Sequence, residues 1–519
     1  MSDRKRYQDL FEARETFSPA EIRFEYVRRT LGLFLGPLAF ALLVLLPPAS
    51  LPLPAARLAA VLAWVLIWWA TEAVPLPITA LLGPSLCVVT GVGKAAETFA
   101  PFGDPIIFLF LGSFILAEAM YATRLDRRFA FAILARPAVS ATSTRIFVVF
   151  GLITAGMSAW LSNTATAAMM YPIGMSILSA LSQLLSSAEG RTVDLSRLRY
   201  GTALMLVVAY GASIGGIATP VGTPPNLVAI GQLESLAGIR ISFFQWMVMA
   251  TPIMLVMLAT LLVYLRLALP PESEQIPGST SHVAEERRAL GPWTSAQRNV
   301  LIAFLVTVAL WVLPGLLALF LGTDAPLYRT TQRYLPEGVV ALLGALLLFV
   351  LPVDWRQRQY TMTWNNAARI DWGTLLLFGG GLSLGDAMFK TGLSKYVGQA
   401  IVGLTHARSP AALSYLFGAT AMALTETTSN VAATTMVCPL AIAAAKAAGI
   451  SPVAPAVSSA LTASMAFLLP VSTAPNAIVY GSGCVPITAM LRHGAVLDLV
   501  GLVIIPGAVL LLSRLLGLA

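Results

Sequence analysis

The sequence predicts an all-α, polytopic membrane protein, and two observations lead to that prediction. Of the 519 residues, 57% are hydrophobic and only 11% are charged, and the mean hydropathy is +0.78. Soluble domains carry about 25% charged residues, so the composition excludes a water-soluble enzyme and an intrinsically disordered chain. Apolar runs also recur along the chain, without the alternating ten-residue segments typical of an outer-membrane barrel.

These apolar runs predict about eleven transmembrane helices, since about 20 apolar helical residues cross the hydrocarbon core. In chain order they lie at 30–48, 55–73, 77–92, 105–122, 201–218, 243–268, 298–321, 337–352, 372–389, 456–470 and 495–517. Two further apolar stretches, 144–184 and 411–448, are rich in Ser, Thr, Asn, Gly and Pro. We do not expect those two stretches to be plain lipid-facing helices.

Charged segments divide the chain. Residues 1–29 are strongly charged and precede the first apolar run, which predicts a cytoplasmic arm rather than a cleavable signal peptide. The polar segment 270–297 predicts a linker between two halves, 30–269 and 298–519. Basic residues gather in short loops such as 124–128, so the net charge of +8 reflects membrane topology and not nucleic-acid binding. Three scattered cysteines predict neither a disulfide framework nor a metal cluster.

Three sequence blocks occur once in each half, in the same order. Residues 108–125 match 376–393, Ser158–Asn163 matches Thr425–Asn430, and Pro220–Asn226 matches Pro470–Asn476. Duplicated halves of this kind are typical of secondary transporters. Basic residues follow the opening helix more densely in the first repeat than in the second, which favours opposite membrane orientations and hence an inverted repeat.

Each repeat places a Ser-Asn pair inside an apolar stretch and follows it with a Pro-, Thr- and Asn-containing block. Both stretches are expected to break their helices, because Ser, Thr and Asn compete for backbone hydrogen bonds and Pro removes a donor. Freed amides at half-helix N-termini suit an anion, whereas freed carbonyls and hydroxyls suit a hard cation such as Na⁺. Ser and Thr are also common at ordinary helix contacts in membranes, but two copies at matched positions favour a binding site.

Ser162-Asn163-Thr164 and Ser429-Asn430-Val431 resemble the paired Ser-Asn-Thr motifs of the divalent anion/sodium symporter family. Ala463–Val479 resembles the C-terminal signature of that family, and Thr71–Ala80 resembles its N-terminal region. The resemblance runs from about residue 55 to the C-terminus. It implies a homodimer in the cell inner membrane, with a scaffold part and a part that moves like an elevator in each protomer. It also implies re-entrant hairpins at about 144–184 and 411–448, whose tips meet at the substrate.

The resemblance further implies two repeat-related sodium sites with one substrate site between them. One sodium site would use Ser158, Ser162, Asn163 and the backbone at Gly222. The other would use Thr425, Thr428, Asn430 and the backbone at Ser472. Substrate carboxylates would meet Asn163, Thr164, Thr223, Ser429, Asn430 and Thr473. The pocket would be shaped by Pro224, Pro225, Ala474 and Pro475. Val431 departs from the family motif, which has a threonine there, and so removes one hydroxyl from the expected pocket.

The leading hypothesis is therefore sodium-coupled symport of a small divalent anion, with a C4-dicarboxylate (succinate, malate or fumarate) as the expected substrate. No Arg or Lys occurs from 146 to 190 or from 409 to 445, so Na⁺ and helix dipoles are expected to neutralise the anion. Sodium-independent exchange, proton coupling through Glu426, and citrate or sulfate as the substrate remain alternatives. For Glu426 two roles are equally compatible with the sequence: it could help to hold the sodium site, or it could form a purely structural pair.

The sequence disfavours an intramembrane enzyme. It has no His-Glu-x-x-His, and Gly-x-Ser-x-Gly occurs only inside apolar runs, at 211–215 and 381–385, where helix packing explains it better. The three histidines, His282, His406 and His493, fall in or beside polar loops, so we expect them to be solvated. We expect Glu118 and Asp386, which occupy matched positions, to pair near helix ends.

Overall fold

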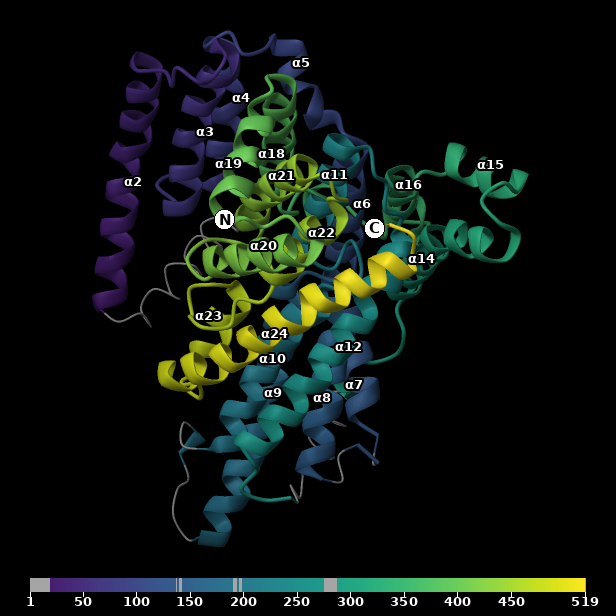
Figure 1. The fold of residues 1–519 in the computed structure, drawn as a ribbon. Helices are drawn as coiled ribbons and strands as arrows, with labels where there is room; N and C mark the ends of the chain where they lie inside the picture. Colours follow the sequence, from purple (N-terminus) through teal and green to yellow (C-terminus); the bar gives the residue numbers. More distant parts are fainter. Residues whose placement is uncertain are drawn as a thin grey trace.

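A computed structural model of the chain describes residues 19–136, 138–139, 142–189, 194–195, 198–274 and 287–518. The described residues are almost entirely helical, with one short antiparallel sheet formed by β1 (Pro352–Asp354) and β2 (Gln359–Tyr360). The long helices pack side by side in a single assembly (Figure 1). The predicted all-α membrane fold is confirmed.

The helices of the first half run from the N-terminal region to the charged linker. They are α2 (Pro19–Leu45), α3 (Leu53–Thr71), α4 (Leu76–Val89), α5 (Ala95–Phe99), the 3₁₀ helix η1 (Ala100–Gly103), α6 (Pro105–Ala122), α7 (Leu125–Leu134), α8 (Ser143–Ser158), α9 (Asn163–Glu189), α10 (Arg199–Gly216), α11 (Pro224–Ala237) and α12 (Phe243–Ala268). Helix α2 already includes residues 19–29 of the expected arm.

The helices of the second half follow the linker, of which residues 275–286 lie outside the described residues. They are α14 (Ser295–Leu321), α15 (Pro326–Tyr334), α16 (Glu337–Val350), α17 (Trp364–Ala367), α18 (Trp372–Lys390), α19 (Leu393–Thr405), α20 (Pro410–Thr425), α21 (Asn430–Ala448), α22 (Val453–Ala463), α23 (Ala474–Tyr480) and α24 (Ile487–Leu515).

Within the described residues, eight helices are long and apolar enough to cross a membrane. They are α2, α3, α6, α9, α12, α14, α21 and α24, and α15 with α16 forms a ninth candidate that is bent by 62°. Other expected spans are shorter helices, such as α4 and α22. The apolar run 456–470 is not one helix, because α22 ends at Ala463 and the chain stays non-helical until α23.

The sequence repeat is also a structural repeat. Helices α6 to α12 correspond in order to α18 to α24, and each repeat breaks at the same two places. The first break separates α8 from α9 at 159–162 and α20 from α21 at 426–429. The second break separates α10 from α11 at 217–223 and α22 from α23 at 464–473, so it is three residues longer in the second repeat.

The two repeats pack reciprocally. Helix α11 lies against α21 and α22, while its counterpart α23 lies against α9 and α10, and α12 contacts α24. The buried positions of α12 also recur in α24, for example Trp246 with Met490 and Ile253 with Leu497. Each repeat therefore packs the helix that follows its second break against the other repeat.

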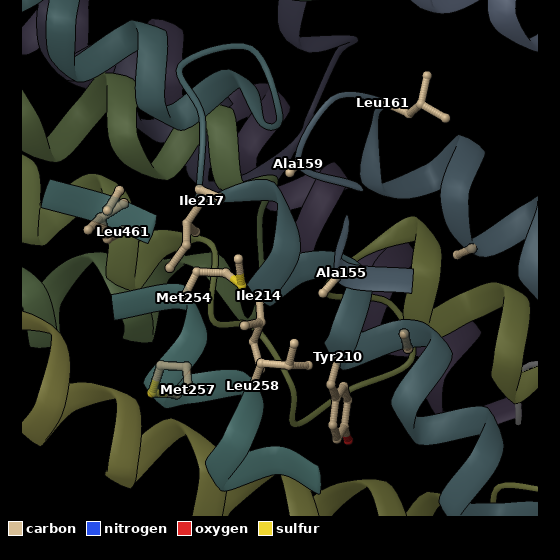
Figure 2. Packing of buried hydrophobic residues seen from close by; sticks show 14 of the residues in the cluster. Ala155, Ala159, Leu161, Tyr210, Ile214, Ile217, Met254, Met257, Leu258 and Leu461 are labelled. Carbon is tan, nitrogen blue, oxygen red and sulfur yellow. The ribbon is translucent and has the colours of Figure 1, made fainter. Parts of the chain in front are cut away.

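The central core in the first repeat is apolar and close-packed. Ala155 of α8, Ile214 of α10, and Met254 and Leu258 of α12 gather in one cluster (Figure 2). A Cβ at Gly215 would lie 2.3 Å from the carbonyl oxygen of Ala155, so α8 and α10 touch backbone to backbone. This close contact fixes the end of α8 beside the end of α10, where the two breaks of the first repeat begin.

Candidate functional site

The first break of each repeat is closed by the same side-chain hydrogen bond. Ser158 Oγ, at the end of α8, donates to Asn163 Oδ1 at the start of α9 over 2.8 Å. Thr425 Oγ1, at the end of α20, donates to Asn430 Oδ1 at the start of α21 over 2.7 Å. Each Asn amide thereby turns its oxygen toward the break and leaves its Nδ2 group for another acceptor. The four residues belong to the predicted sodium sites, and the structure brings them together in pairs.

The second break of each repeat is held by an asparagine to which the sequence analysis assigned no role. Asn226 Nδ2 lies 3.0 Å from the carbonyl oxygen of Gly216 and 2.7 Å from that of Thr219. Asn476 Nδ2 makes the matching bonds, to Ala466 at 2.9 Å and Leu469 at 3.0 Å. Both side chains are fully buried. These bonds satisfy carbonyl groups that lose their helical partners at the break. The matched positions of the two asparagines in the repeated block could have indicated this role from the sequence.

The two breaks of the first repeat meet in a cluster of oxygen atoms around Gly222. A Cβ on Gly222 would lie 2.5 Å from the carbonyl oxygen of Gly216, 2.9 Å from that of Ala159 and 3.0 Å from that of Ser158. Asn163 Oδ1 adjoins this group, since a Cβ on Gly216 would lie 2.3 Å from it. We call these four oxygens the first oxygen cluster. Uncharged carbonyl and amide oxygens are the ligands that broken transporter helices offer to Na⁺.

A second oxygen cluster occupies the matching place in the second repeat. Thr425 Oγ1 lies 2.7 Å from Asn430 Oδ1 and 2.8 Å from the carbonyl oxygen of Ala463, the last residue of α22. Ser472, the counterpart of Gly222, places its Oγ 3.0 Å from the carbonyl oxygen of Glu426. The second oxygen cluster thus comprises Thr425 Oγ1, Asn430 Oδ1 and the carbonyl oxygens of Ala463 and Glu426. The second repeat therefore carries a serine side chain at the position where the first repeat has a glycine packed tightly against carbonyl oxygens.

Two predicted sodium ligands, Thr428 and Ser162, lie outside the oxygen clusters. Thr428 Oγ1 donates to the carbonyl oxygen of Trp69 over 3.0 Å and therefore joins α3 to the first break of the second repeat. Ser162 is exposed, and its Oγ accepts from the amide of Ala165 over 3.2 Å, which makes it the cap of α9. Neither hydroxyl belongs to an oxygen cluster, although both residues lie on the segments that form one.

The predicted substrate residues gather at four helix N-termini. Helices α9, α11, α21 and α23 begin at Asn163, Pro224, Asn430 and Ala474, and the positive ends of their dipoles favour an anion there. Ser429 and Thr473 cap their helices, whereas Thr223 makes no side-chain cap bond. Thr164 and Ala474 are exposed and Thr223 and Pro225 are buried. Val431 is half-buried and packs against apolar neighbours.

Glu426 and Arg28 bring charge to the first break of the second repeat. The Glu426 carboxylate accepts from the amides of Phe467 and Leu468, at 3.1 and 3.3 Å, and from Ser472 Oγ at 2.7 Å. Arg28 of α2 donates from Nη1 to the carbonyl oxygen of Thr427. Its other nitrogen, Nη2, lies 3.1 Å from Glu25 Oε1. A scan of residues 409–445 for basic side chains could not find this contact, because it comes from a helix almost 400 positions away.

The expectation that His493 is solvated is wrong. His493 is 5% exposed, and its Nδ1 lies 2.9 Å from the hydroxyl oxygen of Tyr264. The error arose because α24 begins at Ile487, eight residues before the predicted span. His406 is exposed at the end of α19, as expected, and His282 lies outside the described residues.

Asp386 and the serines of the two Gly-x-Ser-x-Gly stretches lie as expected. Asp386 pairs with Lys390 Nζ at 2.6 Å near the end of α18. Ser213 and Ser383 of the Gly-x-Ser-x-Gly stretches lie inside helices α10 and α18. Across the part of the chain that the structure describes, no group of three or more His, Cys, Asp or Glu side chains could hold a metal ion.

The chain is similar to known proteins along most of its length. The family model described as "Sodium:sulfate symporter transmembrane region" matches residues 28–518. A sodium-dependent dicarboxylate transporter, SdcS, of Staphylococcus saprophyticus is 34% identical over 482 residues, which cover 92% of this chain and 90% of that protein. The transporter of the same name from Staphylococcus aureus strain USA300 is 32% identical over 507 residues, with 96% and 93% covered.

The fold is also similar to that of a solved transporter structure. The crystal structure of the YdaH transporter of Alcanivorax borkumensis, described as having an unusual topology, aligns with a TM-score of 0.51. The alignment covers 90% of this chain and 98% of that one, at 14% sequence identity. At this identity the likeness concerns the fold alone.

Proposed function

Because the chain belongs to the sodium:sulfate symporter transmembrane family, we propose that it is a sodium-coupled symporter of C4-dicarboxylates such as succinate, malate and fumarate. The observation that carries the proposal is the pair of repeat-related oxygen clusters, each beside helix N-termini that suit an anion. The relatives that are 32–34% identical are named as sodium-dependent dicarboxylate transporters, which favours dicarboxylate over sulfate.

The amide groups of Asn163 and Asn430 suggest how cation and anion binding are coupled. In each repeat the Oδ1 atom belongs to an oxygen cluster. A sodium ion bound there would fix the orientation of the amide and of the broken backbone around it. The Nδ2 group on the other side would then be positioned to donate to a substrate carboxylate, together with the free helix N-termini. Sodium ions would in this way complete the anion site before the substrate binds.

Few basic side chains lie at the site, which supports a role for sodium ions in binding the anion. A doubly charged anion in a membrane-embedded site must be neutralised, and Arg28, the basic side chain that contacts the second motif, is already paired with Glu25 and lies 3.6 Å from Glu72. Bound sodium ions supply the missing positive charge in our proposal. Inward-facing and outward-facing states would then exchange by an elevator-like movement in a homodimer of the cell inner membrane, with the two repeats in opposite orientations.

Uptake by proteoliposomes tests the proposal. The purified protein is reconstituted, and [¹⁴C]succinate uptake is measured with an inward Na⁺ gradient and with choline in place of Na⁺. We expect accumulation only with Na⁺, with competition by malate and fumarate and weaker competition by sulfate and citrate. Equal uptake in choline, or succinate counterflow that persists without sodium, would replace the proposal with sodium-independent exchange.

A further inference from the structure

A pair of buried carboxyl groups lies beside the second oxygen cluster. Asp498, in the middle of α24, is 6% exposed, and Glu426, at the first break of the second repeat, is 7% exposed. The two carboxyl groups lie within hydrogen-bonding range of each other. Two carboxylates at this separation repel each other strongly in a medium of low dielectric constant.

The surroundings do not neutralise this pair. Glu426 has its hydrogen bonds from Phe467, Leu468 and Ser472, whereas neither carboxylate oxygen of Asp498 has a hydrogen bond of ordinary geometry, and the Phe467 amide that also faces Asp498 already donates to Glu426. Tyr210, which faces the pair from α10, donates its hydroxyl to the carbonyl oxygen of Phe467 over 2.8 Å. The carboxylate oxygens of Asp498 are therefore buried acceptors without a donor of their own.

The first repeat shows that the fold does not require charges at these positions. The counterpart of Glu426 is Ala159, and the counterpart of Asp498 is Met254. Both belong to the apolar cluster in which Ile217 and Leu258 also lie (Figure 2). Met254 and Asp498 are both buried, on helices most of whose buried positions match. Since buried, unpaired carboxyl groups are destabilising, their presence in one repeat only indicates a function.

We propose that Glu426 and Asp498 bind a further sodium ion, in addition to the ions at the two oxygen clusters. A single shared proton would satisfy one oxygen of Asp498 and leave the other without a partner. A metal ion can contact both oxygens of Asp498 and a lone pair of Glu426 at once. The site adjoins the second oxygen cluster, because the carbonyl oxygen of Glu426 is part of that cluster and Ser472 Oγ contacts both groups of Glu426.

This inference rests on the proposed sodium-coupled function and has a measurable consequence for charge movement. Two sodium ions and one divalent anion carry no net charge across the membrane together. With one more sodium ion, each cycle moves one positive charge, so an inside-negative membrane potential should accelerate succinate uptake.

The experiment compares wild-type protein, Asp498→Asn and the matched repeat-one control Met254→Leu in proteoliposomes. Accumulation of ²²Na⁺ and [¹⁴C]succinate is measured in the same vesicles, with and without a potassium–valinomycin potential. We expect Asp498→Asn to take up one sodium ion fewer per succinate and to lose its response to the potential. We expect Met254→Leu to behave as wild type. An unchanged ratio and an unchanged response in Asp498→Asn would overturn the inference.

A binding measurement keeps the inference testable if Asp498→Asn does not transport. Equilibrium ²²Na⁺ binding without substrate is measured on detergent-purified wild type, Asp498→Asn and Asp498→Met, the last of which copies the residue of the first repeat. Loss of one bound sodium ion in both variants supports the site, and full sodium binding in both overturns it. Proton uptake in place of sodium at this pair would also overturn it. If the wild-type protein shows no sodium-driven uptake, the proposed function is refuted instead. The two results can be told apart because the binding assay tests the Glu426–Asp498 site without transport.

Discussion

Replacing Gly222 with alanine perturbs the first oxygen cluster at its most crowded point. The added Cβ would lie 2.5, 2.9 and 3.0 Å from three carbonyl oxygens, whereas ordinary contact begins at 3.4 Å. Relief requires backbone carbonyls to move away by up to roughly 1 Å, and overpacking of this kind costs about 1–3 kcal/mol. If that cost falls on the sodium-bound state, the apparent sodium affinity decreases about 5- to 150-fold.

The assay is the sodium dependence of succinate uptake and of thermal unfolding, measured on Gly222→Ala and on Gly156→Ala. Gly156 lies on the neighbouring helix α8, and its added Cβ would meet nothing within 4 Å. We expect the sodium concentration for half-maximal uptake to rise in Gly222→Ala and to stay unchanged in Gly156→Ala. A Gly222→Ala protein with wild-type sodium dependence would refute the assignment of these carbonyl oxygens as sodium ligands.

Three further predictions follow from particular side chains. Asn163→Ala and Asn430→Ala should each abolish sodium-driven succinate uptake while the protein still folds, because each removes a cluster oxygen and an amide donor; near-normal uptake in both would contradict the site. Val431→Thr restores the hydroxyl of the family motif. Competition assays with this variant should reveal a changed preference among succinate, sulfate and citrate. An unchanged preference would mean that residue 431 lies outside the pocket. Burial raises the pKa of Asp126, outside the candidate spans, to about 6, so its charge destabilises the fold as the pH rises from about 4 through 6. Asp126→Asn should therefore stabilise the protein at pH 7.5 by about 2–3 kcal/mol and flatten that pH dependence in thermal unfolding. Equal stability of the two proteins at pH 7.5 would show that burial does not raise the pKa of this carboxyl group.

Features that follow from residue type could be predicted from the sequence. The helix breaks were predictable because Ser, Asn and Pro disfavour continuous helix, and the repeat offsets identified Asn163 and Asn430 as equivalent. The bonds from Ser158 and Thr425 to those asparagines join residues only five positions apart, so local spacing was enough to place them together.

Features that depend on chain packing could not be predicted in the same way. The carbonyl oxygens of Ala159 and Gly216 are backbone atoms, which no residue type marks, and they converge only because α8 and α10 pack backbone to backbone. Thr428 bonds to α3 rather than to the second oxygen cluster. Asp498 reaches Glu426 across 72 positions of sequence, and a single carboxylate in an apolar run does not indicate its partner.

Coupling between the two fluxes is the central claim, and it is reciprocal: a gradient of either solute must drive the other. In proteoliposomes with equal sodium inside and outside, an inward succinate gradient should drive accumulation of ²²Na⁺ above its external concentration, and Asn163→Ala should abolish that accumulation. Succinate entry without any net movement of ²²Na⁺ would contradict sodium-coupled symport.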